Sequence, residues 1–257
     1  NKIRSVQDKE MHVEEVSGND KTVDIVVDIF NRVNSGGTKL SKGDLALAKI
    51  CADWPDARRE LKATLKRWAD KGLNFKMEWL LRNVNAICTG EAIFSALENV
   101  PIHEFEEGLK AAEKHSNYVL NLLATSLGLD HDRVVASRYA FAVMCAYLHS
   151  RDGKMPNAAE RKKLLYWYIH TILWGRYSGS TESTLKQDLE LLKGEQPLER
   201  LIGQMRVARA DLTLNPEDFR VWSVGSRFYP LLYMLTRVNK ARDWGTGAEM
   251  SALMHGP

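Results

Sequence analysis

A polar loop with two consecutive glycines has the residue types in this sequence that are best suited to chemistry. It comprises residues 34–38 and lies between two segments of helical periodicity. Glycine adopts positive φ readily, and no side chain covers its N–H group. Ser41 then begins a capped helix, so free amides and the positive end of a helix face one spot. Such a spot suits a phosphate or carboxylate, and the candidate ligands are Asn34, Ser35, Gly36, Gly37 and Thr38.

The same loop has a second interpretation as a tight turn between helices. In that case Gly36 and Gly37 solve the turn geometry and Asn34 caps the first helix. The loop lacks the Gly-Lys-Ser/Thr ending of a P-loop, and a helix rather than a strand is predicted before it. From these residues alone, the turn and the anion site both remain open.

A second polar loop combines a cation, a phenol and a hydroxyl group in Arg176, Tyr177 and Ser178. These three side chains could line a polar pocket. The alternative is a capped turn in which Arg176 lies near the C-terminus of the preceding helix, where the helix dipole favours a positive charge.

A row of basic residues, Arg59, Lys62 and Lys66, follows one side of a predicted amphipathic helix. They could contact the phosphates of DNA, although such a row is more often the solvated face of a helix. The whole chain has 36 Lys+Arg against 33 Asp+Glu and a net charge of +3. That balance permits a local basic surface without demanding one.

No metal site is predicted. Asp130-His131-Asp132 has no further ligands at a recognised spacing, and we expect one of the aspartates to cap a helix from Arg133. The three cysteines are far apart and odd in number, which favours reduced thiols in the cytoplasm. The longest apolar run is too short to span a bilayer, so we expect a soluble cytoplasmic protein with no membrane contact.

Helical periodicity dominates the rest of the chain. It predicts a mainly α, multi-helix globular bundle, with a short β segment at residues 11–16. Two nearly all-apolar segments, 134–148 and 157–174, are expected to pack together as the middle of the core. Further helices are predicted from Ser41 and Pro55, at 77–88, 91–99 and 103–127, after the 176–182 loop, and at 197–207, 216–224 and 227–238.

Three stretches of the chain resemble the GmrSD-type restriction proteins. The first, Ile29 to Ser41, matches a pattern of approximately Phe-x-Arg-hydrophobic-Asn-Ser/Thr-Gly-Gly-Thr-x-Leu-Ser. The second is Arg176-Tyr177-Ser178-Gly179 followed by Leu-x-x-Asp-Leu from Leu185 to Leu189, and the third is residues 243–247, Asp-Trp-Gly-Thr-Gly. The resemblance thus touches the helical part along most of its length.

In that family a ParB/sulfiredoxin-like domain with an Asp-Gly-Gln-Gln-Arg motif hydrolyses nucleoside triphosphate, a helical region follows, and a His-Me finger nuclease often completes the protein. Neither catalytic signature occurs in this sequence. The resemblance therefore implies a fragment from the middle of such a protein, inactive alone, with residues 1–20 as the remnant of a preceding α/β domain. Residues 21–257 would form the helical domain, with a sub-boundary near 128–133. The absence of an initiating methionine agrees with a fragment.

The resemblance also implies roles for individual residues. Arg32 would face phosphate charge and Asn34 would help complete the nucleotide pocket, while the amides of Gly36 and Gly37 would bind an oxygen. The implied partners are DNA, the missing N-terminal and nuclease domains, a nucleoside triphosphate with Mg²⁺ in the full-length protein, and a second copy if it is a homo-oligomer. No cofactor is expected in this segment itself. The competing hypothesis is a non-catalytic helical module for protein interaction or DNA docking.

Overall fold

The structure, a computed structural model, describes residues 42–219 and 228–253. Within these ranges the chain forms α-helices joined by turns and two short 3₁₀ segments, which confirms the predicted mainly α class. The extended pairing found in this part of the chain is an isolated bridge between Arg242 and Glu249. The β segment expected at 11–16 and the glycine loop at 34–38 lie outside the described residues.

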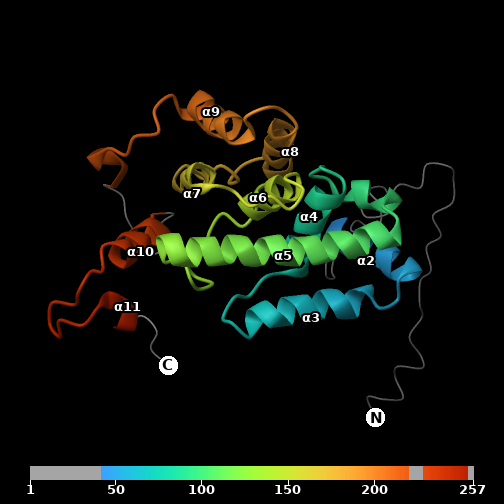
Figure 1. Ribbon diagram of the computed structural model, residues 1–257, viewed down its shortest axis with the longest axis horizontal. Helices are drawn as coiled ribbons and strands as arrows, with labels where there is room; N and C mark the ends of the chain where they lie inside the picture. The colour runs from blue at the N-terminus through green and yellow to red at the C-terminus, as the bar shows by residue number, and fades with distance from the viewer. Residues whose placement is uncertain (1–41, 220–227, 254–257) are drawn as a thin grey trace, which may run out of the picture.

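The helices follow the chain in the order shown in Figure 1. They are α2 (Lys42–Asp53), α3 (Ala57–Ala69), α4 (Met77–Cys88), the 3₁₀ segment η2 (Phe94–Asn99), α5 (Ile102–Leu127), α6 (Ala140–His149), α7 (Ala158–Leu173), α8 (Thr181–Leu192), α9 (Pro197–Arg209), the 3₁₀ segment η3 (Pro216–Phe219), α10 (Tyr229–Val238) and α11 (Met250–Leu253).

The long helix α5 runs across the bundle, and α3 lies along it (Figure 1). Helices α4, α5 and α6 each pack against the other two and form the centre of the fold. The contact of α4 with α5 is close at Gly108, because a Cβ atom there would collide with the Sγ atom of Cys88. A glycine on α5 therefore sets how near the two helices come.

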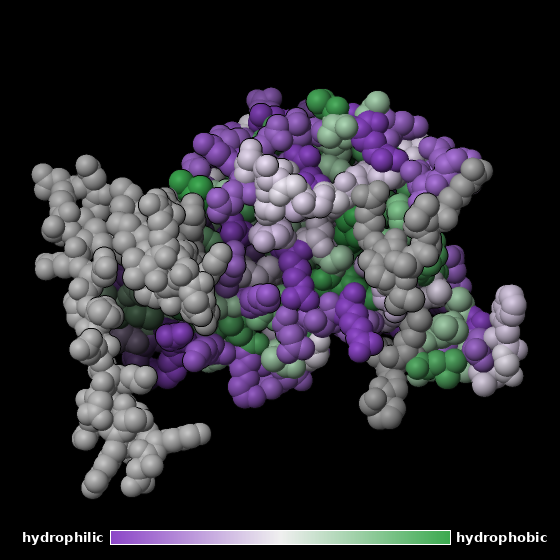
Figure 2. All heavy atoms as spheres, turned by 180° about the vertical axis from the view of Figure 1, so that it is seen from behind, coloured by the Kyte–Doolittle hydropathy of each residue, from purple (hydrophilic) through white to green (hydrophobic). Residues whose placement is uncertain are grey.

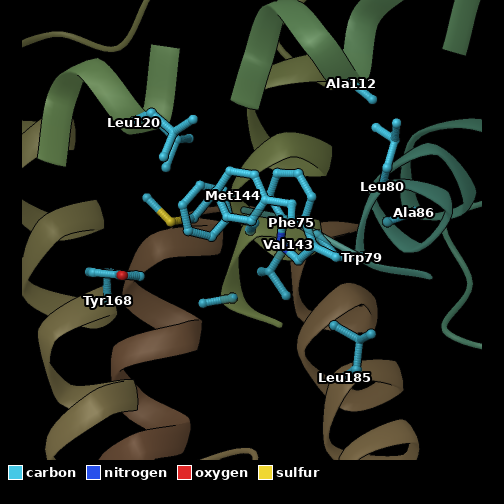
Figure 3. Close-up of a cluster of buried hydrophobic side chains, with 14 of the residues drawn as sticks. Phe75, Trp79, Leu80, Ala86, Ala112, Leu120, Val143, Met144, Tyr168 and Leu185 are labelled. Atoms are coloured by element: carbon cyan, nitrogen blue, oxygen red, sulfur yellow. The ribbon is translucent and has the colours of Figure 1, made fainter. Parts of the chain in front are cut away.

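Aromatic side chains connect four segments of the core. The ring of Trp79 on α4 stacks on that of Phe75 at a centroid distance of 3.9 Å, and it meets the ring of Phe141 on α6 edge-on at 5.4 Å. Trp68 on α3 contacts both Phe75 and Trp79, while Tyr168 on α7 contacts Phe141. Figure 3 shows Phe75 and Trp79 at the middle of this cluster, with side chains of the surrounding helices directed toward them.

Two predicted helices differ from the observed ones over described residues, and of the helix expected at 216–224 the described residues form only the 3₁₀ segment η3. The helix expected at 134–148 begins only at Ala140, because Ser137 has a positive φ of 49° that an α-helix cannot contain. The preceding residues are held by other contacts, such as the hydrogen bond that the Tyr168 hydroxyl donates to the Ala136 carbonyl. The helix expected at 91–99 is the shorter 3₁₀ segment η2.

The expected pairing of the two apolar helices is also only a minor contact. Helix α6 packs chiefly against α4 and α5 and meets α7 over a small area, whereas α7 packs chiefly against α9. One main core nevertheless extends from α2 to α10 through the described residues. Whether a boundary near 128–133 divides the helical region stays a prediction.

The surface opposite to the view of Figure 1 is largely hydrophilic where it is described, and hydrophobic residues show at the edge that carries α10 and α11 (Figure 2). The exposed apolar residues of α10 are Tyr229, Leu232, Leu235 and Val238. Among the described helices, none combines the length and the apolar character that crossing a membrane requires.

Candidate functional site

A cavity of about 310 Å³ lies between the beginning of α4 and the beginning of α6. Its lining combines three cations with one carboxylate and two aromatic rings. The volume falls at the lower end of the range of small-ligand pockets, roughly 300–1,000 Å³. The lining residues are Lys76, Glu78, Trp79, Arg82, Arg138 and Tyr139.

Local sequence explains how α4 contributes to this cavity. Lys76 is the N-cap residue of α4, and Glu78 and Arg82 are four residues apart, so both lie on one face of the helix. The Nη2 atom of Arg82 donates to the Oε1 atom of Glu78 at 3.1 Å. The indole of Trp79 points into the core (Figure 3) and its N–H group donates to the Arg138 carbonyl at 3.0 Å. This bond ties the cavity wall on α4 to the segment that leads into α6.

Arg82 is the unusual residue of the cavity because its side chain is only 6% exposed. Its Nη1 atom donates to the Ala92 carbonyl at 3.1 Å, and its guanidinium group lies over the rings of Phe94 and Tyr139 at 4.6 and 5.3 Å. Its Nε atom is buried and has no hydrogen-bond partner among the described residues. A buried donor without an acceptor is destabilising. Arg82 is therefore held firmly in place with one donor unused.

The other wall of the cavity is held by Arg138. Its Nη2 atom lies 2.6 Å from Oδ1 of Asp132, and its Nη1 atom donates to the Asn74 carbonyl. Asp132 also accepts from the Asn74 amide at 3.0 Å. The expectation that an aspartate caps a helix at Arg133 is thus wrong, because the chain turns there and the helix that follows α5 begins only at Ala140. Asp132 instead fixes the loop that carries Arg138.

Two of the residues predicted for a polar pocket, Arg176 and Tyr177, have their polar groups directed at Asp188 of α8. The Nε and Nη2 atoms of Arg176 donate to the two carboxylate oxygens of Asp188 at 2.7 and 2.5 Å. The Tyr177 hydroxyl donates to the same carboxylate at 2.7 Å. Asp188 is fully buried and the Arg176 side chain is 6% exposed, so the three side chains form one enclosed network.

The electrostatics of this network keep Tyr177 protonated. Burial, followed by the charge of Asp188 and the hydrogen bond to it, raises the pKa of Tyr177 well above its usual range. The third predicted residue, Ser178, is exposed, and its hydroxyl donates to the Gly175 carbonyl at 2.6 Å. The capped-turn alternative placed Arg176 beside the end of the preceding helix, whereas its guanidinium group binds α8.

The basic residues predicted to contact DNA lie on the exposed face of α3. Arg59 forms an ion pair with Asp56 at 2.9 Å, and Lys66 forms one with Asp70 at 2.7 Å. Among the described residues, Lys62 has no carboxylate within ion-pair distance. The face is thus accessible to a polyanion, with two of its three positive charges partly neutralised by neighbours.

The predicted phosphate-binding residues Arg32, Asn34, Ser35, Gly36, Gly37 and Thr38 lie outside the described residues. No group of three or more His, Cys, Asp or Glu side chains that could hold a metal ion occurs in the ranges that the structure describes. The cysteines Cys51, Cys88 and Cys145 are free thiols. Burial raises the pKa of Cys88 to about 11, so this thiol stays protonated at neutral pH.

Sequence reasoning missed the cavity around Arg82. The available signal was a charged residue beside apolar ones, Trp79-Leu80-Leu81-Arg82, in the helix predicted at 77–88. A buried arginine needs a partner or a ligand. Glu78, one turn earlier, accounts for only one of its donors. The matching wall, Arg138 and Tyr139, comes from a distant part of the chain, which helix periodicity cannot reveal.

In comparisons with known proteins, no family model matches the chain, and no curated protein matches it.

Proposed function

We propose that this chain is the helical region of a GmrSD-like, nucleotide-dependent DNA restriction protein that acts in phage defence. The observation that carries the proposal is the segment Ile29–Ser41, with Arg32, Asn34 and the glycine pair at the spacing of that family's motif. In this proposal these residues complete a nucleotide site, with nucleoside triphosphate and Mg²⁺ bound by the full-length protein. The helical region itself carries no cofactor and does not catalyse hydrolysis alone.

The second resembling segment supports the proposal because its two halves contact each other in the fold. The two halves of that segment are Arg176-Tyr177 and the Leu-x-x-Asp-Leu run that contains Asp188, and their polar groups meet in one buried network. The third segment is similar, since Oδ1 of Asp243 accepts from the amides of Gly245 and Thr246 and organises the turn.

The position of α2 also agrees with the proposal. This helix follows the glycine loop directly in the sequence and packs against α4 and η2. A Cβ atom on Gly43 would lie 3.4 Å from the Glu78 side chain and 3.6 Å from the Phe94 ring. The helix that follows the loop therefore lies close against residues that hold Arg82, so loop and bundle can act together.

The proposal assigns nuclease and hydrolase chemistry to domains outside this chain, with DNA, nucleotide and those domains as partners. A homo-oligomer is compatible with it. The free thiols and the absence of a spanning helix among the described residues support a cytoplasmic location.

Substitution of the loop in the full-length protein tests the site. Arg32→Ala and Asn34→Ala should each abolish most triphosphate hydrolysis, because they remove a phosphate-facing cation and a pocket amide. Circular dichroism and thermal unfolding should match the wild type. Arg133→Ala, which removes an exposed arginine outside the motif, serves as the matched control. Unchanged turnover in both loop variants would remove Arg32 and Asn34 from the nucleotide site.

The alternative function is DNA docking or protein interaction without nucleotide chemistry. The exposure of Arg59, Lys62 and Lys66 on α3 favours it, while the ion pairs of Arg59 and Lys66 weaken it. Titration of labelled duplex DNA at two salt concentrations separates the hypotheses, because phosphate contacts make affinity fall steeply with salt. A lack of binding at both concentrations would exclude docking through this face.

A further inference from the structure

Arg82 presents a guanidinium edge that is only partly hydrogen-bonded, whereas the same edge of Arg176 is fully bonded to a carboxylate. In Arg176, the edge formed by Nε and Nη2 binds both oxygens of the Asp188 carboxylate. In Arg82, Nη2 of the same edge bonds one oxygen of Glu78, and Nε has no hydrogen-bond partner among the described residues. An oxyanion that spans this edge would satisfy the unused donor, as the planar fork of arginine favours.

The Glu78 carboxylate is a weak occupant of that edge. Its single hydrogen bond to Arg82 is 3.1 Å long, and its side chain is 43% exposed. Water competes for the carboxylate of Glu78 but not for the guanidinium group of Arg82, which is only 6% exposed. Because a buried guanidinium group without a counter-charge is destabilising, Glu78 leaves the edge of Arg82 only when another anion takes its place.

The surroundings of Arg82 favour an anion of more than one charge. Lys76 and Arg138 bring two further positive charges to the cavity. The negative charges nearby are those of Glu78 in the lining and of Asp132, which is bonded to Arg138. The guanidinium group of Arg82 is already fixed between Phe94 and Tyr139, so binding does not have to order it. The cavity of about 310 Å³ has room for a phosphate group and for part of the molecule that carries it.

We propose that the α4–α6 cavity is a phosphate-binding site in which Arg82 is the anchor and Glu78 is an internal competitor. A phosphate group binds Nε and Nη2 of Arg82 and displaces Glu78 into solvent, while Lys76 at the cavity mouth adds its charge. The site consists entirely of described residues outside the glycine loop, so it goes beyond the proposed function and does not depend on it.

Calorimetric titration of the purified chain with inorganic phosphate at constant ionic strength tests the site. Arg82→Gln should weaken binding about tenfold or more, because it removes the charge and the fork. Glu78→Gln should strengthen binding about three- to fivefold, because it removes the competing carboxylate. The matched controls are Arg58→Gln and Glu107→Gln, which make the same changes at exposed positions away from the cavity and should leave the affinity unchanged.

The Glu78 variant keeps the test decisive if Arg82→Gln fails to fold, since Glu78 is partly exposed. Affinity that is unchanged or lowered in Glu78→Gln would overturn the proposal, as would wild-type affinity in a folded Arg82→Gln. A parallel titration with acetate should show at least tenfold weaker binding than phosphate, and equal binding would overturn the assignment to phosphate. None of these outcomes depends on nucleotide hydrolysis or on Arg32, so failure here leaves the proposed function standing.

Discussion

Two buried arginines in this protein are held in opposite ways. Arg176 meets a fully buried carboxylate, Asp188, through two parallel hydrogen bonds, and Tyr177 completes the group. Arg82 is equally buried, but its carboxylate partner Glu78 is 43% exposed and binds it through one hydrogen bond. The first arginine has its edge filled from within the chain, whereas the second lines a cavity with a donor left over.

The difference shows how to separate a structural arginine from a binding arginine. Both side chains are 6% exposed, so burial alone does not distinguish them. What differs is whether the chain supplies acceptors for the whole guanidinium edge. A filled edge makes the arginine part of the fold, and a partly filled edge beside a cavity makes it available to a ligand.

The largest expected effect follows from breaking the filled pair. Asp188→Asn should lower the free energy of unfolding by about 3–5 kcal/mol, because it leaves the buried charge of Arg176 without a counter-charge. Chemical denaturation at pH 7 measures this loss. The control is Glu190→Gln on the same helix, where the ion pair with Lys193 is exposed, and the expected loss is about 0.5 kcal/mol or less. Equal losses in the two variants would contradict the structural role of Asp188.

An intermediate effect is expected at the third member of that network. Tyr177→Phe removes a buried hydrogen bond to a charged group and should cost about 2 kcal/mol at pH 7. The raised pKa of Tyr177 also predicts a pH dependence. Above the unfolded tyrosine pKa of about 10, the unfolded chain releases a proton that the folded chain keeps. Stability is therefore fully present below that pH and is lost as the pH rises above it.

The measurement is urea denaturation of wild type and Tyr177→Phe at pH 8 and at a pH about one unit above the tyrosine reference value. The wild type should lose more stability between the two conditions than the variant does. Tyr166→Phe, at a partly exposed tyrosine, is the control and should behave like the wild type. Equal pH sensitivity in wild type and Tyr177→Phe would mean that Tyr177 ionises as freely in the folded protein as in the unfolded chain.

The smallest expected effect is at the partly filled arginine. Arg82→Met should cost only about 1 kcal/mol in denaturation experiments, since it loses the bonds to the Ala92 carbonyl and to Glu78 but also removes a buried unpaired donor. Methionine keeps much of the apolar contact with the rings of Phe94 and Tyr139. Arg58→Met, at an exposed site, is the control. A loss as large as that of Asp188→Asn would show that Arg82 is as structural as Arg176.

Much of the fold was predictable because it depends on local periodicity. The helix at 77–88 has the predicted bounds. The helix predicted at 157–174 is α7, whose N-terminus is defined by a capping box between Asn157 and Glu160. The start of α6 was not predictable, because the turn at Ser137 is fixed by contacts with α7, such as the bond between the Ser137 and Thr171 hydroxyl groups. Such long-range contacts cannot be inferred from the spacing of apolar residues in the sequence.

The candidate site was less predictable than the fold. Arg176 was predicted to line a polar pocket. Its partner Asp188 lies on the next helix, and the sequence indicated it only as part of a motif that resembles the family. Arg82 was overlooked because its neighbours Leu80, Leu81 and Val84 made the helix look like ordinary core. The cavity exists only because the segment before α6 returns to the beginning of α4, and the roles assigned to Arg32–Thr38 stay predictions.

Trp79 has a consequence for how the cavity can respond to a guest. Its ring is locked among Phe75, Trp68 and Phe141, so it cannot shift without disturbing three other segments of the core. The same end of α4 also brings to the cavity the long side chains of Lys76, which is exposed, and Glu78, which is partly exposed. The lining thus combines a fixed indole ring with charged side chains that can move. Ligands should be selected by their shape against the indole ring and by their charge at Lys76 and Glu78.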